Sequence, residues 1–295
     1  MIDPEARICN WQRIGRYAYQ SANWMERIGR ALTPLVALGV RFWLGPVFLF
    51  SGLLKLADWN AALLLSTYEY PVSWLAPETA ALLGLVTEVG GGALMIAGLA
   101  TRGAALSLAI LSIVVQTEYL HLNEHIYWAI LCLWLVVHGP GPLSLDHLIT
   151  RGAYSSALPL AQSLERLFLG VGRFITPVFL LGLRLFLTMI LAVSALGVMT
   201  PDDQPLLLWF SFDTASLPSE LPRAAAAAIA SGLALLIASG LSLRLTALVW
   251  GSLLTAMILN DSVRGLGRID ALYWLILLSI LVVHGAGRIS IDWII

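Results

Sequence analysis

Residues 30–41 read RALTPLVALGVR, and residues 173–184 read RFITPVFLLGLR. The shared pattern, R-x2-T-P-x4-G-x-R, returns after 143 residues. Further matches follow in the same order and at nearly the same spacing: Gly98–Arg102 with Gly240–Arg244, Tyr127-Trp128 with Tyr273-Trp274, and His138–Asp146 with His284–Asp292. Matches in one order at a nearly constant offset predict a tandem internal repeat.

The composition predicts a membrane protein. Of the 295 residues, 59% are hydrophobic and only 12% are charged, and the mean hydropathy is +0.83. An average soluble domain has roughly 25% charged residues, so we expect the lipid bilayer to surround this chain. The net charge of −1 gives a nucleic-acid partner no electrostatic support.

Eight apolar segments approach the roughly 20 residues that a helix needs to cross a bilayer. They lie at about 35–57, 79–100, 103–120, 126–143, 177–199, 223–242, 245–260 and 270–287. Four fall in each copy, so both copies have the same orientation, as parallel repeats do. We therefore predict an all-α integral membrane protein with two tandem parallel-repeat four-helix transmembrane bundles and about eight spans.

The arginines predict the orientation. With the N-terminus in the cytoplasm, 13 of the 17 Lys and Arg residues lie on the cytoplasmic side, which is the positive-inside pattern of an inner (plasma) membrane protein. An even number of spans also returns the C-terminus to the cytoplasm. The predicted parts are an amphipathic cytoplasmic segment, a first four-helix unit, a linker or interfacial helix, and a second, diverged four-helix unit: 1–33, 34–150, 151–176 and 177–295.

The first segment is expected to lie on the membrane surface, with a disordered basic tail as the alternative. The dipeptides Thr33-Pro34 and Thr176-Pro177 are typical of helix starts, with Thr as the N-cap and Pro in the first turn. We therefore predict that the first span of each unit begins at these dipeptides.

Charged and histidine residues that occur in both copies are explained by the shared fold. These predicted structural residues are Arg41, Arg102, His138 and Asp146, with Arg184, Arg244, His284 and Asp292 as their counterparts. Each histidine precedes a glycine that could end a helix. Each aspartate could favour the N-terminal dipole of the segment that follows.

Polar residues present in only one copy need another explanation. Lys55 corresponds to Val198 and Glu88 to Ala230, yet both charged residues lie in apolar spans. A charge at the bilayer centre costs roughly 2.5–3.5 kcal/mol on insertion scales. We expect the two to meet across the outer half of the first bundle. They would form either a structural ion pair or a catalytic, proton-handling or headgroup-binding site; Lys55 could also snorkel alone.

A second polar cluster contains Glu118, His121 and His125. On a helix these positions, i, i+3 and i+7, share one face. Two imidazoles and a carboxylate can bind zinc, iron or copper, so the cluster is a candidate metal site. A gating or substrate-contact loop and a plain interfacial loop are the alternatives.

The first copy resembles the DoxX family. Residues 41–55 contain R-x3-G-x2-F-x2-S-G-x2-K, residues 88–94 read EVGGGAL, and residues 139–146 end in the pattern G-x-G-x-x-S-x-D. The resemblance covers about residues 35–150, and the second copy lacks the Lys and the Glu. It implies a four-helix membrane bundle associated with respiratory or sulfur redox chemistry, which includes quinone-linked thiosulfate oxidation.

The resemblance and the unshared residues together favour a redox-associated protein that binds quinone in its first unit. Lys55 and Glu88 would contact the quinone carbonyls and move protons, and the expected lining residues are Trp43, Phe48, Gly91 and Trp128. A membrane redox protein would then be the electron-carrying partner. The alternative is a noncatalytic accessory subunit or assembly factor of a membrane redox complex, and a small-molecule transporter is third.

Overall fold

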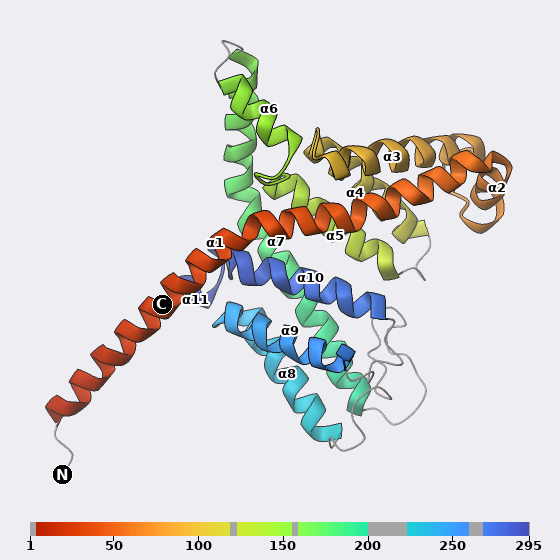
Figure 1. Cartoon of the computed structure of the whole chain (residues 1–295). Coiled ribbons are helices and arrows are strands. Elements are labelled where there is room, and N and C mark those ends of the chain that lie inside the picture. The colour runs from red at the N-terminus through yellow and green to blue at the C-terminus, as the bar shows by residue number, and fades with distance from the viewer. Residues whose placement is uncertain (1–3, 119–122, 155–158, 200–222, 260–267, 295) are drawn as a thin grey trace.

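The computed structural model describes residues 4–118, 123–154, 159–199, 223–259 and 268–294 (Figure 1). Every element in these ranges is a helix. The predicted all-α class is therefore confirmed for the part of the chain that the structure describes. The segment 200–222 lies outside it.

The helices of the first half pack in chain order. They are α1 (Pro4–Ala57), α2 (Trp59–Leu64), the π-helix η1 (Leu65–Glu69), α3 (Pro77–Ala97), α4 (Thr101–Glu118) and α5 (Asn123–His138). Helix α1 packs along α3, α3 along α4, and α4 along α5 (Figure 1). We call the end of this bundle at Lys55 and Glu118 the Lys55 end, and the opposite end the Arg41 end.

The helices of the second half follow the same order of packing. They are α6 (Leu145–Tyr154), α7 (Pro159–Met199), α8 (Arg223–Ser239), α9 (Leu243–Leu259), α10 (Arg268–His284) and α11 (Ile291–Ile294). Helix α7 packs along α8, α8 against α9, and α9 along α10. Helix α10 also lies against α1, and α5 lies against α7, so the two halves share one apolar core.

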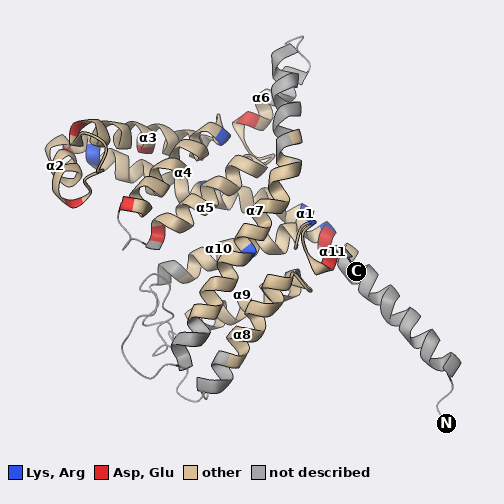
Figure 2. Ribbon diagram, turned by 180° about the vertical axis from the view of Figure 1, so that it is seen from behind, with Lys and Arg blue, Asp and Glu red and all other residues tan. Residues whose placement is uncertain are grey.

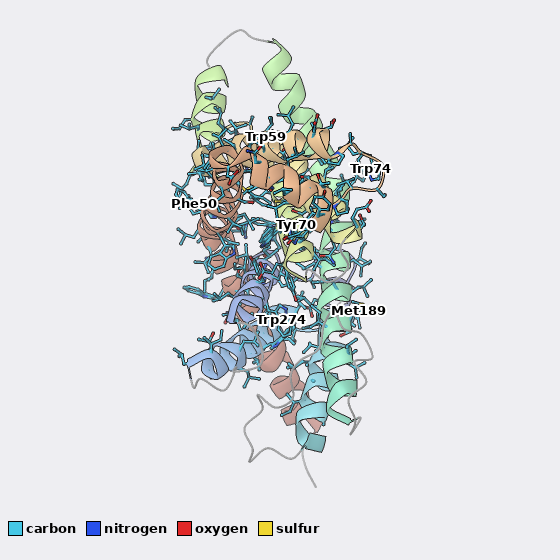
Figure 3. All side chains as sticks on the ribbon, turned by 90° about the vertical axis from the view of Figure 1, so that its right-hand side faces the viewer. Phe50, Trp59, Tyr70, Trp74, Met189 and Trp274 are labelled. Carbon is cyan, nitrogen blue, oxygen red and sulfur yellow. The ribbon has the colours of Figure 1, made fainter. Side chains whose placement is uncertain are left out.

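Several of these helices suit a lipid environment. Among the described residues, three stretches are long and apolar enough to cross a membrane: Asn23–Ala57, Pro77–Ala97 and Phe174–Val193. Shorter apolar helices accompany them: Glu124–His138, Ala228–Ser239, Leu243–Ala256 and Ala271–His284. Large apolar side chains such as Phe50 and Met189 are exposed, whereas Trp274 is buried in the core (Figure 3). Such exposed apolar surface is expected of helices that contact lipid.

The predicted helix starts at Thr33-Pro34 and Thr176-Pro177 are wrong. Pro34 lies inside α1, and Pro177 lies inside α7. The Thr33 hydroxyl donates backward to the carbonyl of Gly29 at 3.0 Å, a bond that Thr makes inside a helix rather than at an N-cap. A proline removes only one helical hydrogen bond, and packed apolar helices tolerate that loss. The predicted segments 1–33 and 151–176 therefore contain helix that continues into the following spans.

Arg41 joins three segments at the Arg41 end. Its guanidinium donates to the carbonyls of Met95 and Ile96 in the last turn of α3, both at 2.9 Å. It also donates to the carbonyls of Pro140 and Leu143, at 3.2 and 2.7 Å, in the loop after α5. The last carbonyls of a helix have no partner within the helix, and this arginine supplies one. Arg41 is only 2% exposed.

Arg184 makes the corresponding bonds in the second half. Its guanidinium donates to the carbonyls of Ile237 and Ala238 at the end of α8. It also donates to the carbonyls of Ala286 and Ile289 after α10, at 3.2 and 2.6 Å. The two buried arginines therefore hold the same junction in each half.

The paired aspartates cap helices. The Asp146 carboxylate accepts from the backbone N–H groups of Ala100 and Thr101, at 2.7 and 2.8 Å, where α4 begins. In the second half, the Asp292 carboxylate accepts from the N–H groups at the start of α9, those of Ser242 and Leu243, at 2.7 and 3.1 Å. Each aspartate therefore caps a helix that is distant in the chain, and it also lies in the first turn of its own helix.

The other shared arginines bond within their own halves, and the shared histidines meet between the halves. Arg102 donates to the carbonyl of Val136 at 2.6 Å, and Arg244 donates to that of Val283 at 3.4 Å. The rings of His138 and His284 lie against each other, with centroids 4.3 Å apart. Each histidine Nδ1 faces the carbonyl four residues earlier in its own helix, at 3.2 and 3.1 Å.

We expect Asp146→Ala to lower the free energy of unfolding by about 1 kcal/mol, the usual value of an N-cap. The melting temperature in detergent, followed by intrinsic fluorescence, measures the loss. Asp292→Ala is the counterpart in the second half and should behave alike, because it removes the same two bonds. Asp146→Asn keeps one side-chain oxygen and should lose less. Equal melting temperatures of Asp146→Ala and the wild type would contradict the capping role.

Candidate functional site

The expected contact between Lys55 and Glu88 is present. Lys55 lies in the last turn of α1, and its Nζ is 2.5 Å from Oε1 of Glu88 in α3. The side chain of Glu88 is 9% exposed, and that of Lys55 is 26% exposed. Figure 2 shows an acidic residue within the length of α3, away from both ends of that helix. The catalytic role of the pair stays a prediction.

Glycines let the backbones of α1 and α3 approach closely enough to form this pair. A Cβ atom on Gly92 would lie 2.7 Å from the backbone nitrogen of Leu49, and one on Gly52 would lie 2.9 Å from that of Val89. Real Cβ atoms do not come this close to backbone atoms, so both positions need the small residue. The contacts align the last turn of α1 with the turn of α3 that carries Glu88.

The ion pair leaves a polar atom unsatisfied. Oε2 of Glu88 is buried and has no hydrogen-bond partner within the described residues. Buried polar atoms are nearly always paired in native structures, and exceptions call for an explanation. A bound ligand is one such explanation, because an O–H or N–H group of the ligand could donate a hydrogen bond to Oε2 of Glu88.

Gln116 is a site residue that the sequence reasoning missed. Its side chain is buried, and neither its Oε1 nor its Nε2 has a partner in the described part of the chain. A signal was available: at the offset of 142 that pairs Gly98 with Gly240, Gln116 corresponds to Ile258. Gln116 is therefore a third polar residue whose corresponding position in the second half is apolar.

His125 brings α5 to the same end of the bundle. Gln116 lies two residues before the end of α4, and His125 lies two residues after the start of α5, which packs along α4. The His125 ring lies against that of Trp128, which in turn lies against Phe48 of α1. Nδ1 of His125 is buried without a partner among the residues described. Each of α1, α3, α4 and α5 thus contributes one polar side chain, and we call these four residues the polar cluster: Lys55, Glu88, Gln116 and His125.

Aromatic rings border the polar cluster. The Trp128 ring lies 4.5 Å from the His125 ring and 5.2 Å from that of Phe48, measured between centroids. Two of the predicted ligand contacts, Phe48 and Trp128, therefore lie together beside His125. A third, Trp43, lies 6.0 Å from the Tyr273 ring of the second half.

Gly91, the fourth predicted ligand contact, packs against α4. A Cβ atom on Gly91 would lie 2.9 Å from Cγ of Leu108. The absence of a side chain at Gly91 therefore lets α3 and α4 approach closely. This contact places Gly91 in the packing of the bundle that carries the site.

Two of the candidate metal residues, Glu118 and His125, lie at the Lys55 end. Glu118 accepts a hydrogen bond from the Ser73 hydroxyl at 3.0 Å, and His125 lies beside Trp128. His121 lies outside the described residues. Within the ranges that are described, no group of three His, Cys, Asp or Glu side chains is placed to hold a metal ion. The metal site stays a prediction.

The apolar helices and the buried ion pair define a helical membrane protein with a polar site inside its bundle. The DoxX family model matches residues 36–120, so the chain carries a DoxX domain there, and the predicted family resemblance is confirmed for this segment. The matched residues include Lys55, Glu88 and Gln116. No curated protein matches the chain, and no solved structure matches it.

Proposed function

We propose that the chain is a tandem duplication of one DoxX-like four-helix unit, with about eight spans. The corresponding bonds of Arg41 and Arg184, and of Asp146 and Asp292, support this proposal, because unrelated segments rarely repeat such a set. The distribution of Lys and Arg supports an inner-membrane location with both termini in the cytoplasm. The Lys55 end would then face the outer side.

We further propose that the first unit binds a quinone at the polar cluster. The observation that carries this proposal is a set of buried polar atoms at the Lys55 end that have no partner among the described residues. The Gln116 amide and His125 Nδ1 could donate to the carbonyls of a quinone, and Glu88 Oε2 could accept from a hydroxyl of the quinol. A quinone presents carbonyl oxygens to donors such as the Lys55 ammonium and the Gln116 amide. Its ring is flat and apolar, and Phe48 and Trp128 offer aromatic surfaces to such a ring.

The ion pair also suits proton transfer to a bound quinone. Reduction of a quinone to a quinol takes two electrons and two protons. Lys55 can donate a proton to a carbonyl oxygen. Glu88, after taking up a proton from water at the Lys55 end, can return one to Lys55 across their 2.5 Å contact, and a second round supplies the second proton. The electrons would come from a membrane redox protein, which is the partner that this proposal requires.

Native mass spectrometry in a mild detergent tests the quinone site. We expect a quinone-mass adduct on the wild-type protein, and we expect both Lys55→Ala and Glu88→Gln to lose it, because each removes a polar contact. Glu78→Gln is the matched control, since Glu78 is an exposed glutamate in the first turn of the same helix, α3. It should keep the adduct.

Two outcomes would overturn the quinone site. One is the absence of an adduct from every sample after incubation with quinone. The other is an adduct that Lys55→Ala and Glu88→Gln leave unchanged. Either outcome, together with a protein that co-purifies at a fixed ratio, would favour the accessory subunit or assembly factor.

A further inference from the structure

We propose that Tyr273, from the second half of the chain, is a positioning residue for the site in the first half. It acts by holding the indole of Trp128, which forms the aromatic border of the polar cluster. The inference rests on the proposed quinone site. It assigns to the second half a role in ligand binding although that half lacks counterparts of Lys55 and Glu88.

The two halves exchange a pair of hydrogen bonds where they meet. Trp128 Nε1 donates to the Tyr273 hydroxyl at 2.5 Å, and Trp274 Nε1 donates to the Tyr127 hydroxyl at 2.7 Å. The two tyrosine rings stack, with centroids 5.3 Å apart and an interplanar angle of 10°. Both tyrosines are buried. The exchange is reciprocal: each Tyr-Trp dipeptide supplies one acceptor and one donor.

The two bonds orient indole rings that lie in different surroundings. The Trp128 ring contacts His125 and Phe48, so one bond orients an indole at the polar cluster. The Trp274 ring contacts Trp250 at 5.9 Å, inside the apolar core. At the position that corresponds to His125, the second half has Ala271. The same bond therefore orients a site residue in one half and a core residue in the other.

The bond restricts the orientation of Trp128 for a physical reason. An indole N–H is a donor only, and away from water it needs an acceptor. The Tyr273 hydroxyl provides that acceptor and so selects the rotamer that brings the Trp128 ring against His125. In Tyr273→Phe the indole turns toward another acceptor, and its contact with His125 changes. Tyr273 does not need to touch the ligand for this effect.

We expect Tyr273→Phe to weaken the binding of a short-chain benzoquinone by about 5–10-fold, the effect of one neutral hydrogen bond. Tyr127→Phe is the matched control, because it removes the equivalent hydroxyl from the same interface. It should leave quinone affinity within about twofold of the wild type. Both variants should melt at similar temperatures, so a general loss of stability would not separate them.

A double-mutant cycle tests whether Tyr273 acts through Trp128. In a Trp128→Phe background the donor is absent, so Tyr273→Phe should weaken binding no further. Additive effects of the two changes, or equal affinities of Tyr273→Phe and Tyr127→Phe, would overturn the inference. If Lys55→Ala and Glu88→Gln also bind quinone like the wild type, the proposed site itself fails. If those two variants lose quinone, only the role of Tyr273 fails.

A measurement without ligand keeps the inference testable even where no quinone binds. The protein is labelled with 5-fluorotryptophan, and the 19F resonance of Trp128 is assigned by its loss in Trp128→Phe. We expect Tyr273→Phe to move this resonance, because the ring changes its surroundings. An unmoved resonance would show that the hydroxyl does not hold the indole, and it would overturn the inference.

Discussion

Arg41→Met is expected to lower the free energy of unfolding by about 3 kcal/mol or more. The variant removes four bonds from a charged donor to backbone carbonyls. Hydrogen bonds to charged groups contribute about 1.5–3 kcal/mol each. The carbonyl of Met95, a fully buried residue, would be left without this partner. The melting temperature in detergent should fall by roughly 6–12 °C. Fluorescence-detected size-exclusion chromatography after heating measures that fall.

Arg30→Met is the control for the loss of an arginine from the same helix. Arg30 is 70% exposed and pairs with Glu26 at 3.4 Å. Exposed pairs contribute about 0–1 kcal/mol, so this variant should melt close to the wild type. Arg184→Met should resemble Arg41→Met, because it removes the corresponding bonds. If Arg41→Met melted like Arg30→Met, the junction of α3 with the loop after α5 would not depend on the guanidinium.

The second large effect is expected at the ion pair. Glu88→Leu leaves Lys55 without its partner and should destabilise the protein by about 2 kcal/mol or more. Removing one member of a fully buried pair costs roughly 3–5 kcal/mol, and the value here is lower because the Lys55 side chain is 26% exposed. The double variant Lys55→Met/Glu88→Leu should melt within a few degrees of the wild type, since both charges are gone. It should bind no quinone.

This double variant separates a structural pair from a functional one. Stability that returns while quinone binding stays lost supports a pair retained for its chemistry. Quinone binding that returns with stability would contradict the proposed site, because neither Met nor Leu can donate a proton. A double variant as unstable as Glu88→Leu would show that the cost arises from packing at Gly52, where a Cβ atom would lie 3.0 Å from that of Glu88, rather than from an unpaired charge.

The sequence predicted the helical class and the contact between Lys55 and Glu88, because comparing the two copies singles out charges that the fold does not require. It also predicted that Arg41 and Asp146 are structural. It did not predict their partners, since the carbonyls that Arg41 reaches lie 54–102 residues away along the chain. The local sequence pattern identifies Arg41 as a donor, but it does not identify the helix end whose carbonyls accept from it.

Two misses have clear physical causes. The Thr-Pro dipeptides are compatible with an N-cap, but Thr can also bond to the carbonyl four residues earlier, and the continuous helix α1 uses that bond. Gln116 was missed because an uncharged side chain at the end of an apolar helix has little effect on the hydropathy pattern. Its importance depends on burial without a partner, which only the packed structure provides.

The reciprocal hydrogen bonds between Tyr127-Trp128 and Tyr273-Trp274 bear on why the two halves are joined in one chain. Two separate polypeptides with the same interface would also pair with themselves, and assemblies of two site-bearing or two site-free subunits would form alongside mixed ones. A covalent linker fixes the stoichiometry at one of each, and it raises the effective concentration at which the halves meet. The joined chain can therefore preserve an asymmetry that freely assorting subunits would lose.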